Sequence, residues 1–491
     1  MNTPNLHITT RAGKLRGTLA SDTVRVFRGI PYGQAPVGEL RWRPPVAAAA
    51  WSGTRDALEF GPDCPQTIEV GSRAPGQSED CLSLNIWTPA DTGSQPLPVL
   101  VWVHGGSYVS GSGSESRLDG ARLAGLGMVV VTINYRVGVF GFLAHPGLTG
   151  ESPHQTSSNY GLMDQMLALQ WVQDNIAEFG GDPERVTAFG VSAGSASVAL
   201  LLVSEQARGL FQQAILQSPG TARRLASLEQ AEQAGLALGE DIAALRRLSG
   251  EEVLARTPLL APKVRGLTTP RVLRPIRDGW LLREDEALAY AHGRIQTMPL
   301  LLGTNLDEGS EATANWPIRT PQQYLDLLAD SFGDQAGRAL ELYPAADEAE
   351  VRLRVAELFA DTQFNYGTRL LTRTMAQREP RTWRYVYTHR RAHRSDGPHH
   401  GQEVHFVFGN LLAPYPGEQP LCDARDEALS AAMMQAWTNF ARSGDPNGAQ
   451  APAWSAYRPD QDNHLELGST IAAGQGWRRD QLDFLEAYFR P

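Results

Sequence analysis

Two short apolar runs in the first third of the chain set the predicted architecture. Residues 97–103 and 128–133 are rich in β-branched side chains and are apolar at consecutive positions rather than at alternate ones. A strand covered by helices on both faces needs this pattern, because neither face meets water. We therefore expect both runs to be buried strands of a sheet that lies between layers of helices.

Later segments alternate between the two kinds of pattern. Four have the periodicity or composition of helices: 161–172, 225–260, 320–380 and 428–442. Two more apolar runs, 298–303 and 383–387, predict further strands. This alternation predicts an α/β fold with one large, mixed, mostly parallel sheet in a single domain spanning 1–491, with 225–260 and 320–380 as helical excursions.

One serine stands at the junction of a predicted strand and a predicted helix. In Gly190-Val191-Ser192-Ala193-Gly194, the serine has glycine at both i−2 and i+2. Residues 185–189 before it, after a break at Asp182-Pro183, are typical of a short buried strand, and 195–202 after it predict a helix. Strand, tight turn and helix with serine at the apex form the nucleophile elbow of a serine hydrolase. The glycines let strand and helix approach closely around a strained serine.

A serine nucleophile needs a base, and the base needs an acid to orient it. Asp307 and Glu308 follow the predicted strand at 298–303, and three histidines, His399, His400 and His405, come later. Serine, acid and histidine thus follow in the chain order of the α/β-hydrolase layout. From the residues alone, either carboxylate could serve as the acid, and the choice of histidine depends on geometry.

Backbone donors for a developing oxyanion are also predicted. His104-Gly105-Gly106-Ser107 follows the strand at 97–103, and its glycines leave backbone N–H groups unobstructed. The imidazole of His104 is expected to shape this loop rather than to titrate in the reaction.

Longer motifs point to a family. They run almost end to end: FRGIPY (27–32), LRW (40–42), EDCLSLN (79–85), NYRVG (134–138), FGGDP (179–183), DEG (307–309) and FARSGDPN (440–447). With them the chain resembles the type-B carboxylesterases, α/β-hydrolases that include cholinesterases and bacterial nitrobenzyl esterases. By position, the resemblance implies Ser192 as nucleophile, Glu308 as acid and His400 as base. It implies an oxyanion hole made by the N–H groups of Gly106, Ser107 and Ala193.

The same resemblance implies supporting residues. It pairs Arg41 with Glu79 and Arg136 with Asp164 as structural ion pairs, and it makes Ser218 a support of the acid. It leaves Asp307 as a surface or capping residue and His399 as the main rival of His400. Cys64 and Cys81 match a disulfide pair of the family, but a reducing compartment can keep such thiols free, so the sequence leaves open whether they are bonded.

Two departures from the family pattern bear on substrate. Val191 stands where the family usually has glutamate, which makes the pocket less negative. The loop 65–80 has no aromatic residue that could hold a choline cation. Both features favour small neutral or aryl esters, hydrolysed through an acyl-enzyme without a metal or organic cofactor. The alternatives are carbamates, amides or thioesters at the same site, or a non-catalytic binding module.

Composition narrows the remaining possibilities. A net charge of −10 argues against a nucleic-acid partner. No apolar stretch is long enough to span a bilayer, and the N-terminus lacks the pattern of a signal peptide. Basic residues are almost all arginine, which is typical of a GC-rich bacterial genome. We expect a cytoplasmic monomer or small homo-oligomer whose partner is a small-molecule ester.

Overall fold

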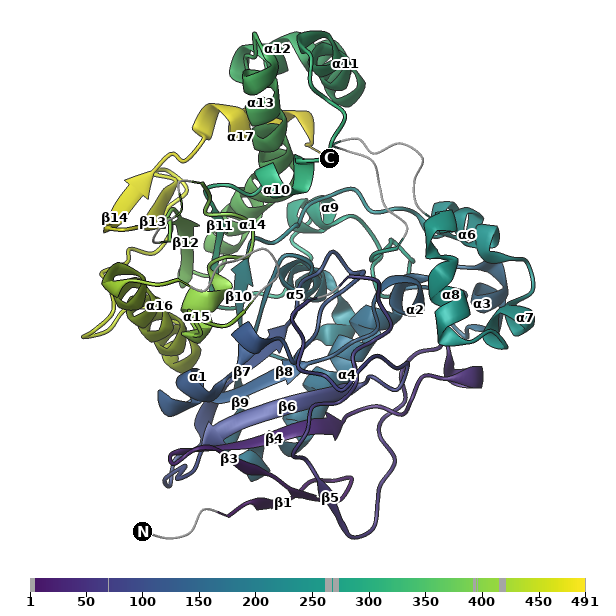
Figure 1. Cartoon of the computed structure of the whole chain (residues 1–491). Coiled ribbons are helices and arrows are strands. Elements are labelled where there is room, and N and C mark those ends of the chain that lie inside the picture. Colours follow the sequence, from purple (N-terminus) through teal and green to yellow (C-terminus); the bar gives the residue numbers. More distant parts are fainter. Residues whose placement is uncertain are drawn as a thin grey trace.

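A single large sheet organises the molecule (Figure 1). The computed structural model describes residues 5–68, 70–260, 267, 273–391, 394, 396–414 and 421–490. Within them, an 11-stranded sheet has the order β14-β13-β12-β11-β10-β9-β7-β8-β6-β4-β3. Neighbours from β13 to β8 run parallel, and the strands outside them pair antiparallel. The predicted α/β class, with its mixed and mostly parallel sheet, is confirmed.

The strands of this sheet are β3 (Thr18–Ser21), β4 (Val24–Pro31), β6 (Ser83–Pro89), β7 (Leu97–Val103), β8 (Val129–Ile133), β9 (Gly181–Val191), β10 (Gln213–Gln217), β11 (Leu300–Asn305), β12 (Thr382–Tyr387), β13 (Asn463–Leu467) and β14 (Ile471–Gln475). A small second sheet near the N-terminus joins β1 (His7–Thr9), β2 (Lys14–Arg16) and β5 (Thr54–Asp56). The predicted break at Asp182-Pro183 is wrong: β9 runs through it, and a register shift against β7 accommodates the irregularity.

The helices are α1 (Ala121–Gly125), α2 (Gly138–Phe142), α3 (Pro146–Glu151), α4 (Tyr160–Asn175), α5 (Ala193–Val203), α6 (Leu228–Gly235), α7 (Ile242–Arg246), α8 (Gly250–Ala255), α9 (Glu286–Ala291), α10 (Ser310–Thr313), α11 (Pro321–Phe332), α12 (Ala336–Leu342), α13 (Glu348–Ala360), α14 (Tyr366–Ala376), α15 (Val404–Phe408), α16 (Ala424–Ser443) and α17 (Arg479–Tyr488). A π-helical turn, Asp361–Asn365, joins α13 to α14. No helix of the described residues is both long and apolar enough to cross a membrane.

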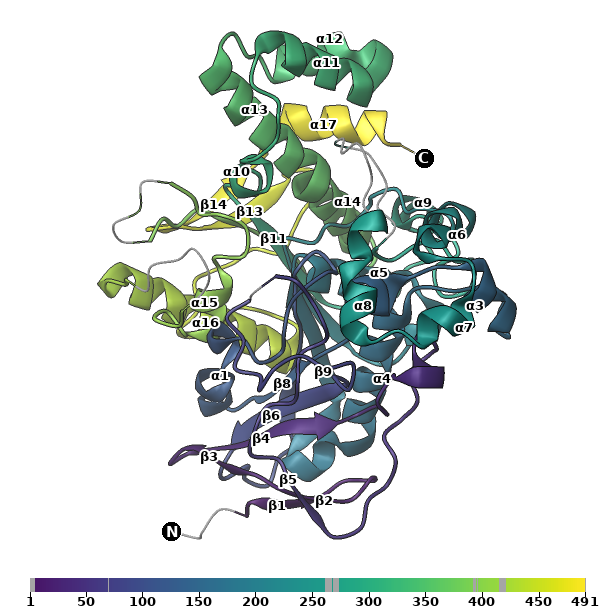
Figure 2. The ribbon, with the colours of Figure 1, turned by 45° about the vertical axis from the view of Figure 1, so that its right-hand side comes forward.

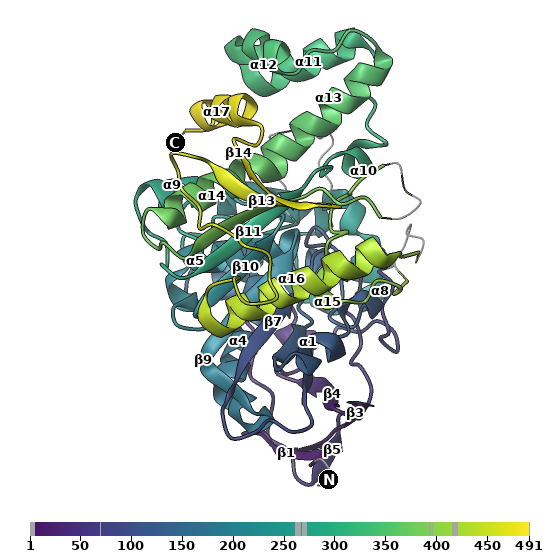
Figure 3. The same ribbon diagram turned by 90° about the vertical axis from the view of Figure 1, so that its left-hand side faces the viewer.

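Each face of the sheet buries its own cluster of side chains. In β7, Val99, Val101 and Val103 belong to one cluster, and Leu100 and Trp102 belong to the other, because successive side chains point to opposite faces. Helices α4, α5 and α14 cover the first face, and α1 and α16 cover the second. Figure 3 shows α16 lying across the strands of the second face.

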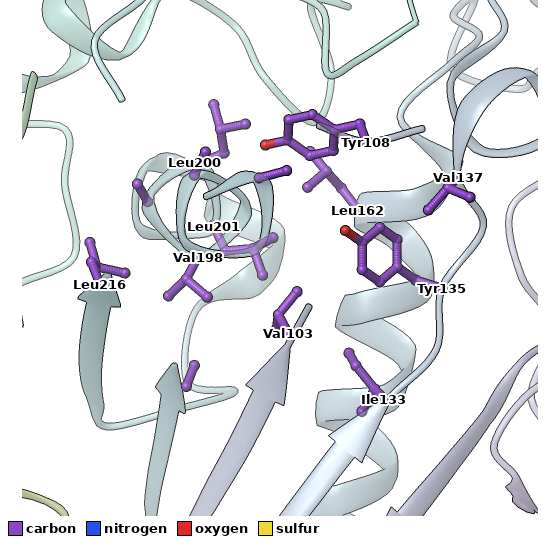
Figure 4. Packing of buried hydrophobic residues seen from close by; sticks show 14 of the residues in the cluster. Val103, Tyr108, Ile133, Tyr135, Val137, Leu162, Val198, Leu200, Leu201 and Leu216 are labelled. Carbon is purple, nitrogen blue, oxygen red and sulfur yellow. The ribbon is translucent and has the colours of Figure 1, made fainter. Parts of the chain in front are cut away.

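The first layer holds the helix that follows the predicted nucleophile. Figure 4 shows Val198 and Leu201 of α5 packed beside Val103 at the end of β7. These side chains have no solvent exposure, so α5 is fixed over the carboxyl ends of the central strands.

Two groups of helices leave the sheet. Short helices α6 to α8 occupy the segment 225–260, and α11 to α13 occupy the first part of 320–380, whereas α14 returns to the sheet and packs on β11 and β12. Figure 2 shows α11, α12 and α13 together at one end of the molecule, beside α17. That the whole chain forms one domain stays a prediction.

Candidate active site

Ser192 occupies the turn between β9 and α5 in a strained backbone conformation. Its φ of 57° and ψ of −123° lie outside the regions that residues with a side chain normally adopt. Two hydrogen bonds hold it there: Ser192 N donates to the carbonyl of Gln217 at 2.9 Å, and Ala196 N donates to the carbonyl of Ser192 at 2.8 Å. The surrounding sheet and helix therefore impose the strain that projects the hydroxyl from the sheet.

The two glycines of the elbow permit this packing. A Cβ at either Gly190 or Gly194 would collide with the carbonyl oxygen of Val103 at the end of β7. Strand, turn and neighbouring strand can approach only without those side chains, so the steric reason given for the sequence motif is confirmed.

The predicted oxyanion loop follows β7 directly. Gly106, Ser107 and Tyr108 all have positive φ, at 110°, 56° and 66°. The amides of Gly106, Ser107 and Ala193 have no hydrogen-bond acceptor within the described part of the chain. Three backbone donors in the predicted loop and elbow are thus available to an external oxygen.

His104 shapes this loop. Its ring stacks on Tyr135 with 4.2 Å between centroids, and Nδ1 lies 2.8 Å from the carbonyl oxygen of Gly105. The Tyr135 hydroxyl donates to the His104 carbonyl at 2.9 Å. Burial lowers the pKa of His104 to about 4, so the ring is neutral near pH 7. The sequence assigned it this structural role.

Glu308, after β11, is held by three hydrogen-bond partners. One carboxylate oxygen accepts from Ser218 Oγ at 2.5 Å and from the backbone N of Asn305 at 2.6 Å. The other bonds His400 Nδ1. Because the Glu308 side chain is buried, these contacts fix its orientation and replace water around the charge.

His400 keeps its second ring nitrogen unpaired. Nε2 is buried and, among the described residues, has no hydrogen-bond partner, Ser192 Oγ included. Phe364 of the π-helical turn packs on the ring with 4.5 Å between centroids. Burial alone lowers the pKa of His400, but the charge and hydrogen bond of Glu308 outweigh it, and the pKa lies above the ordinary value.

The histidine loop lies against the elbow. A Cβ built on Gly401 would sit 3.9 Å from Val191 Cγ2, and Arg117 Nη1 donates to the Gly401 carbonyl at 3.2 Å. The residue before Ser192 and the residue after His400 are therefore neighbours in space. Val191, in the place of the family glutamate, gives this contact an apolar surface.

Asp307 and His399 form a separate pair. Asp307 Oδ2 lies 3.1 Å from His399 Nδ1, and Asp396 Oδ2 lies 3.0 Å from His399 Nε2. Asp307 Oδ1 also accepts from the backbone N of Ser310 at 3.0 Å, at the start of α10. Gly309 is the N-cap residue of α10, and Asp307 lies two residues before it, where its carboxylate accepts hydrogen bonds from the turn that leads into the helix. His405, the third candidate, is buried away from both carboxylates at a lowered pKa caused mainly by burial.

Three further residues contribute to the site, but the sequence analysis did not identify them. Gln217 and Asn305 end β10 and β11, and their side-chain amides donate to the buried carboxylate of Glu403 at 3.0 and 2.6 Å. Burial raises the pKa of Glu403. Phe364 is the third. Gln217 and Asn305 could have been predicted only from their place at the carboxyl ends of parallel strands, where α/β sheets bind their ligands.

The implied ion pairs are present. Arg41 Nε donates to Glu79 at 2.7 Å, and Arg136 Nε donates to Asp164 at 2.8 Å. The second pair is fully buried, so its two charges satisfy each other inside the core.

Two further features concern the cysteines and the candidate metal ligands. Cys64 and Cys81 are buried free thiols, and the hydrogen bond with Cys64, together with burial, raises the pKa of Cys81. Within the described residues, no group of three or more His, Cys, Asp and Glu side chains is placed to hold a metal ion.

Known proteins resemble this chain in sequence and in fold over almost its whole length. Residues 4–485 match the family described as "Carboxylesterase family". The chain is 43% identical over 479 residues to fumonisin B1 esterase of Sphingopyxis macrogoltabida, covering 96% of this chain and 88% of that protein. It is 36% identical over 488 residues to para-nitrobenzyl esterase of Bacillus subtilis (strain 168), covering 94% and 95%.

A third relative and a solved structure agree. Phenmedipham hydrolase of Pseudarthrobacter oxydans is 35% identical over 482 residues, covering 94% of each chain. A structure titled PNB esterase superposes with a TM-score of 0.84 at 34% identity, covering 97% of this chain and 99% of that one. The match runs through both the sequence and the sheet that carries the site. The chain is an esterase of the carboxylesterase family.

Proposed function

We propose that this esterase cleaves carboxylic esters through a Ser192–His400–Glu308 triad. One observation carries the proposal. Buried Glu308 holds His400 by Nδ1, while Nε2 of the same ring is left without a partner in a loop that touches the elbow of Ser192. A base for a serine hydroxyl needs this arrangement, in which one nitrogen is oriented and the other is open to accept a proton.

The reaction proceeds in two halves. His400 Nε2 takes the proton of Ser192 as its oxygen attacks the ester carbonyl, and the amides of Gly106, Ser107 and Ala193 bind the oxyanion. The tetrahedral intermediate collapses, the C–O bond to the alcohol breaks, and His400 returns its proton to the leaving oxygen. Water then attacks the acyl-enzyme with the same base and releases the acid.

Glu308 orients the base in both half-reactions. It fixes the tautomer in which Nδ1 carries the proton and stabilises the imidazolium that forms at each half-reaction. Ser218 and the Asn305 amide donate to its far oxygen and so hold the carboxylate in this orientation.

The substrate class rests on fewer observations. The relatives are named for fumonisin B1, para-nitrobenzyl and phenmedipham, three different substrates, so their names do not select one. Val191 removes a negative charge from beside the base, which supports the expectation of neutral or aryl esters over choline esters.

Replacing the nucleophile tests the mechanism. We expect Ser192→Ala to lower kcat on 4-nitrophenyl esters of acetate to octanoate by about 10⁴-fold or more. Ser195→Ala is the matched control, because this serine lies on the same helix and its buried hydroxyl has no hydrogen-bond partner among the described residues. Its kcat should stay within about twofold of the parent. Full turnover by Ser192→Ala would refute the mechanism.

A further inference from the structure

The oxyanion loop is held in a strained shape. Gly106, Ser107 and Tyr108 have positive φ, and for the two residues that carry side chains this conformation is costly. Two hydrogen bonds close the loop on itself, because the backbone N–H groups of Val109 and Ser110 donate to the Gly106 carbonyl at 2.9 and 3.0 Å. A strained conformation persists only where the surrounding structure fixes it, so the loop needs anchors outside itself.

Gly111 ends the loop and lies directly against its beginning. Its φ is 119°. A Cβ built on Gly111 would sit 2.1 Å from His104 Nδ1 and 2.3 Å from the Gly105 carbonyl oxygen. A Cβ on Gly106 would sit 2.2 Å from the Ser110 carbonyl oxygen. Because the two ends of the loop are in contact, a shift of Gly111 moves the residues that carry the proposed oxyanion donors.

One buried side chain holds Gly111 from a distant part of the chain. Gln66 Oε1 accepts from the backbone N of Gly111 at 2.8 Å, and Gln66 Nε2 donates to the Gly111 carbonyl at 3.0 Å. A single amide group thus binds both backbone polar groups of one residue, which sets the position and the orientation of that residue.

Gln66 is itself fixed by its own segment. Its Nε2 also donates to the Cys64 carbonyl at 3.0 Å, and its backbone N donates to Gln77 Oε1 at 2.9 Å. Gln66 is 5% exposed, so these hydrogen bonds are shielded from water. Loss of the amide would leave buried backbone groups without partners, and the loop would have to move to satisfy them.

We propose that Gln66 is a positioning residue of the oxyanion hole. By binding Gly111, it holds the strained loop so that the amides of Gly106 and Ser107 face the reacting carbonyl. The inference rests on the Ser192 mechanism and the oxyanion donors proposed above. Donors aimed in advance stabilise the charge that develops in the transition state, so a relaxed loop loses transition-state binding and keeps most of its substrate binding.

Replacing the amide with an apolar side chain of similar length tests this role. We expect Gln66→Met to lower kcat on 4-nitrophenyl pentanoate by about 10- to 100-fold, less than removal of a whole oxyanion donor, and to change KM by less than about threefold. The inhibition constant of the trifluoromethyl ketone with the same acyl chain should rise by the factor by which kcat/KM falls, because its hemiketal oxygen binds the same donors.

Gln296→Met is the matched control. Gln296 Nε2 also donates to two backbone carbonyls, those of Leu201 at 2.9 Å and Ser204 at 3.3 Å. Both lie at the end of α5 that is remote from the elbow. The kcat and the inhibition constant of this variant should stay within about twofold of the parent values, although its melting temperature falls.

A second variant keeps the test open if Gln66→Met does not fold. In Gln66→Glu, the protonated carboxyl can still accept from the Gly111 amide and donate to the Gly111 carbonyl, whereas the ionised form has no donor. The kcat of this variant relative to the parent should therefore fall about tenfold between pH 6 and pH 9, as the buried carboxyl ionises. Division by the parent value removes the titration of His400, which both proteins share. An equal ratio at both pH values contradicts the proposed role.

The outcomes separate this inference from the triad. Parental kcat and ketone inhibition in Gln66→Met, with hydrolysis abolished by Ser192→Ala, would overturn the role of Gln66 and leave the mechanism standing. A loss of kcat in Gln66→Met without weaker ketone binding would also overturn it, because that result places the residue in folding alone. Hydrolysis that persists in Ser192→Ala would overturn the mechanism instead.

Discussion

Two neighbouring residues on one loop pair with two neighbouring residues on another, and the two pairs differ in nearly every physical respect. The carboxylate of Glu308, which pairs with His400, is fully buried. Asp307, which pairs with His399, is partly exposed, and Asp396, the second partner of His399, is exposed. Hydrogen bonds between the two loops bring the pairs together: the backbone N of Asp307 donates to the Pro398 carbonyl at 3.1 Å, and the side-chain amide of Asn305 donates to the His399 carbonyl at 2.7 Å.

The two histidines differ in how many of their ring nitrogens lie near a carboxylate. Carboxylates lie near both nitrogens of His399, and its pKa rises to about 9, chiefly through the hydrogen bond with Asp307, so it is protonated at neutral pH and cannot accept a proton. A carboxylate holds one nitrogen of His400, and the other is open. A carboxylate at each nitrogen makes a structural cation, whereas a single carboxylate leaves a base.

Replacing each histidine with glutamine should give the largest difference in kcat between two variants. His400→Gln removes the proposed base, and we expect kcat on a 4-nitrophenyl ester to fall by about 10⁴-fold or more. His399→Gln keeps a polar side chain between the same loops and should lower kcat by less than about tenfold. Circular dichroism of both proteins checks that each is folded. Equal losses of kcat in the two variants would show that His400 and His399 do not differ in function.

Substitution of the two carboxylates should lower kcat in the same order, with a smaller difference between the two variants. Glu308→Gln keeps the shape but removes the charge that stabilises the imidazolium and selects its tautomer, so kcat should fall by about 10³- to 10⁴-fold. Asp307→Asn loses an ion pair near the surface, with an effect on kcat below about tenfold and a lowered melting temperature. Steady-state kinetics and thermal unfolding measure the two effects separately. A larger kinetic loss in Asp307→Asn than in Glu308→Gln would reverse the assignment.

Ser218 provides a finer test of how the acid is held. Ser218→Ala removes one of the donors to the far oxygen of Glu308, and we expect kcat/KM to fall about tenfold. The pH profile should also move, because a less firmly oriented carboxylate raises the pKa of His400 less. A tenfold loss with an unchanged profile would place the role of Ser218 in folding rather than in orienting the acid.

pH should act on the two pairs in opposite directions. His400 must be neutral to accept a proton, so kcat/KM should fall on acidification through its pKa, which lies above 6.5. His399 is stabilised in its protonated form, so its contribution to stability is complete below 6.5 and is lost as the pH rises through about 9.

The size of the His399 effect is limited because its partner Asp396 is exposed to solvent. Solvent screening of this pair keeps the loss on the order of 1 kcal/mol in the free energy of unfolding. Denaturant unfolding between pH 6 and 10 measures it, and His399→Gln should flatten this dependence. An equal slope in parent and variant would show that His399 is not protonated in the folded protein.

Much of the fold could be predicted from the sequence, because the signals were local. The run at 97–103 coincides with β7, and the glycines around Ser192 act through contacts with Val103 that any strand–turn–helix of this kind makes. The bounds of β9 were missed, since a bulge let the strand continue through Pro183.

The site was predictable only in part. The order of Ser192, Glu308 and His400 is visible in the chain, but the sequence could not show which of two adjacent carboxylates meets which of two adjacent histidines. That choice depends on a register between two loops far apart in sequence.

Covalent labelling identifies the nucleophile and its base in one experiment. The enzyme is titrated with a 4-nitrophenyl organophosphate, the released nitrophenolate is counted, and the modified residue is located by mass spectrometry of its peptides. The account predicts one equivalent released, all of the label on Ser192, and labelling slowed by about 10⁴-fold in His400→Gln but by less than about tenfold in His399→Gln. A label on another residue, or equal labelling rates in His400→Gln and the parent enzyme, would contradict it.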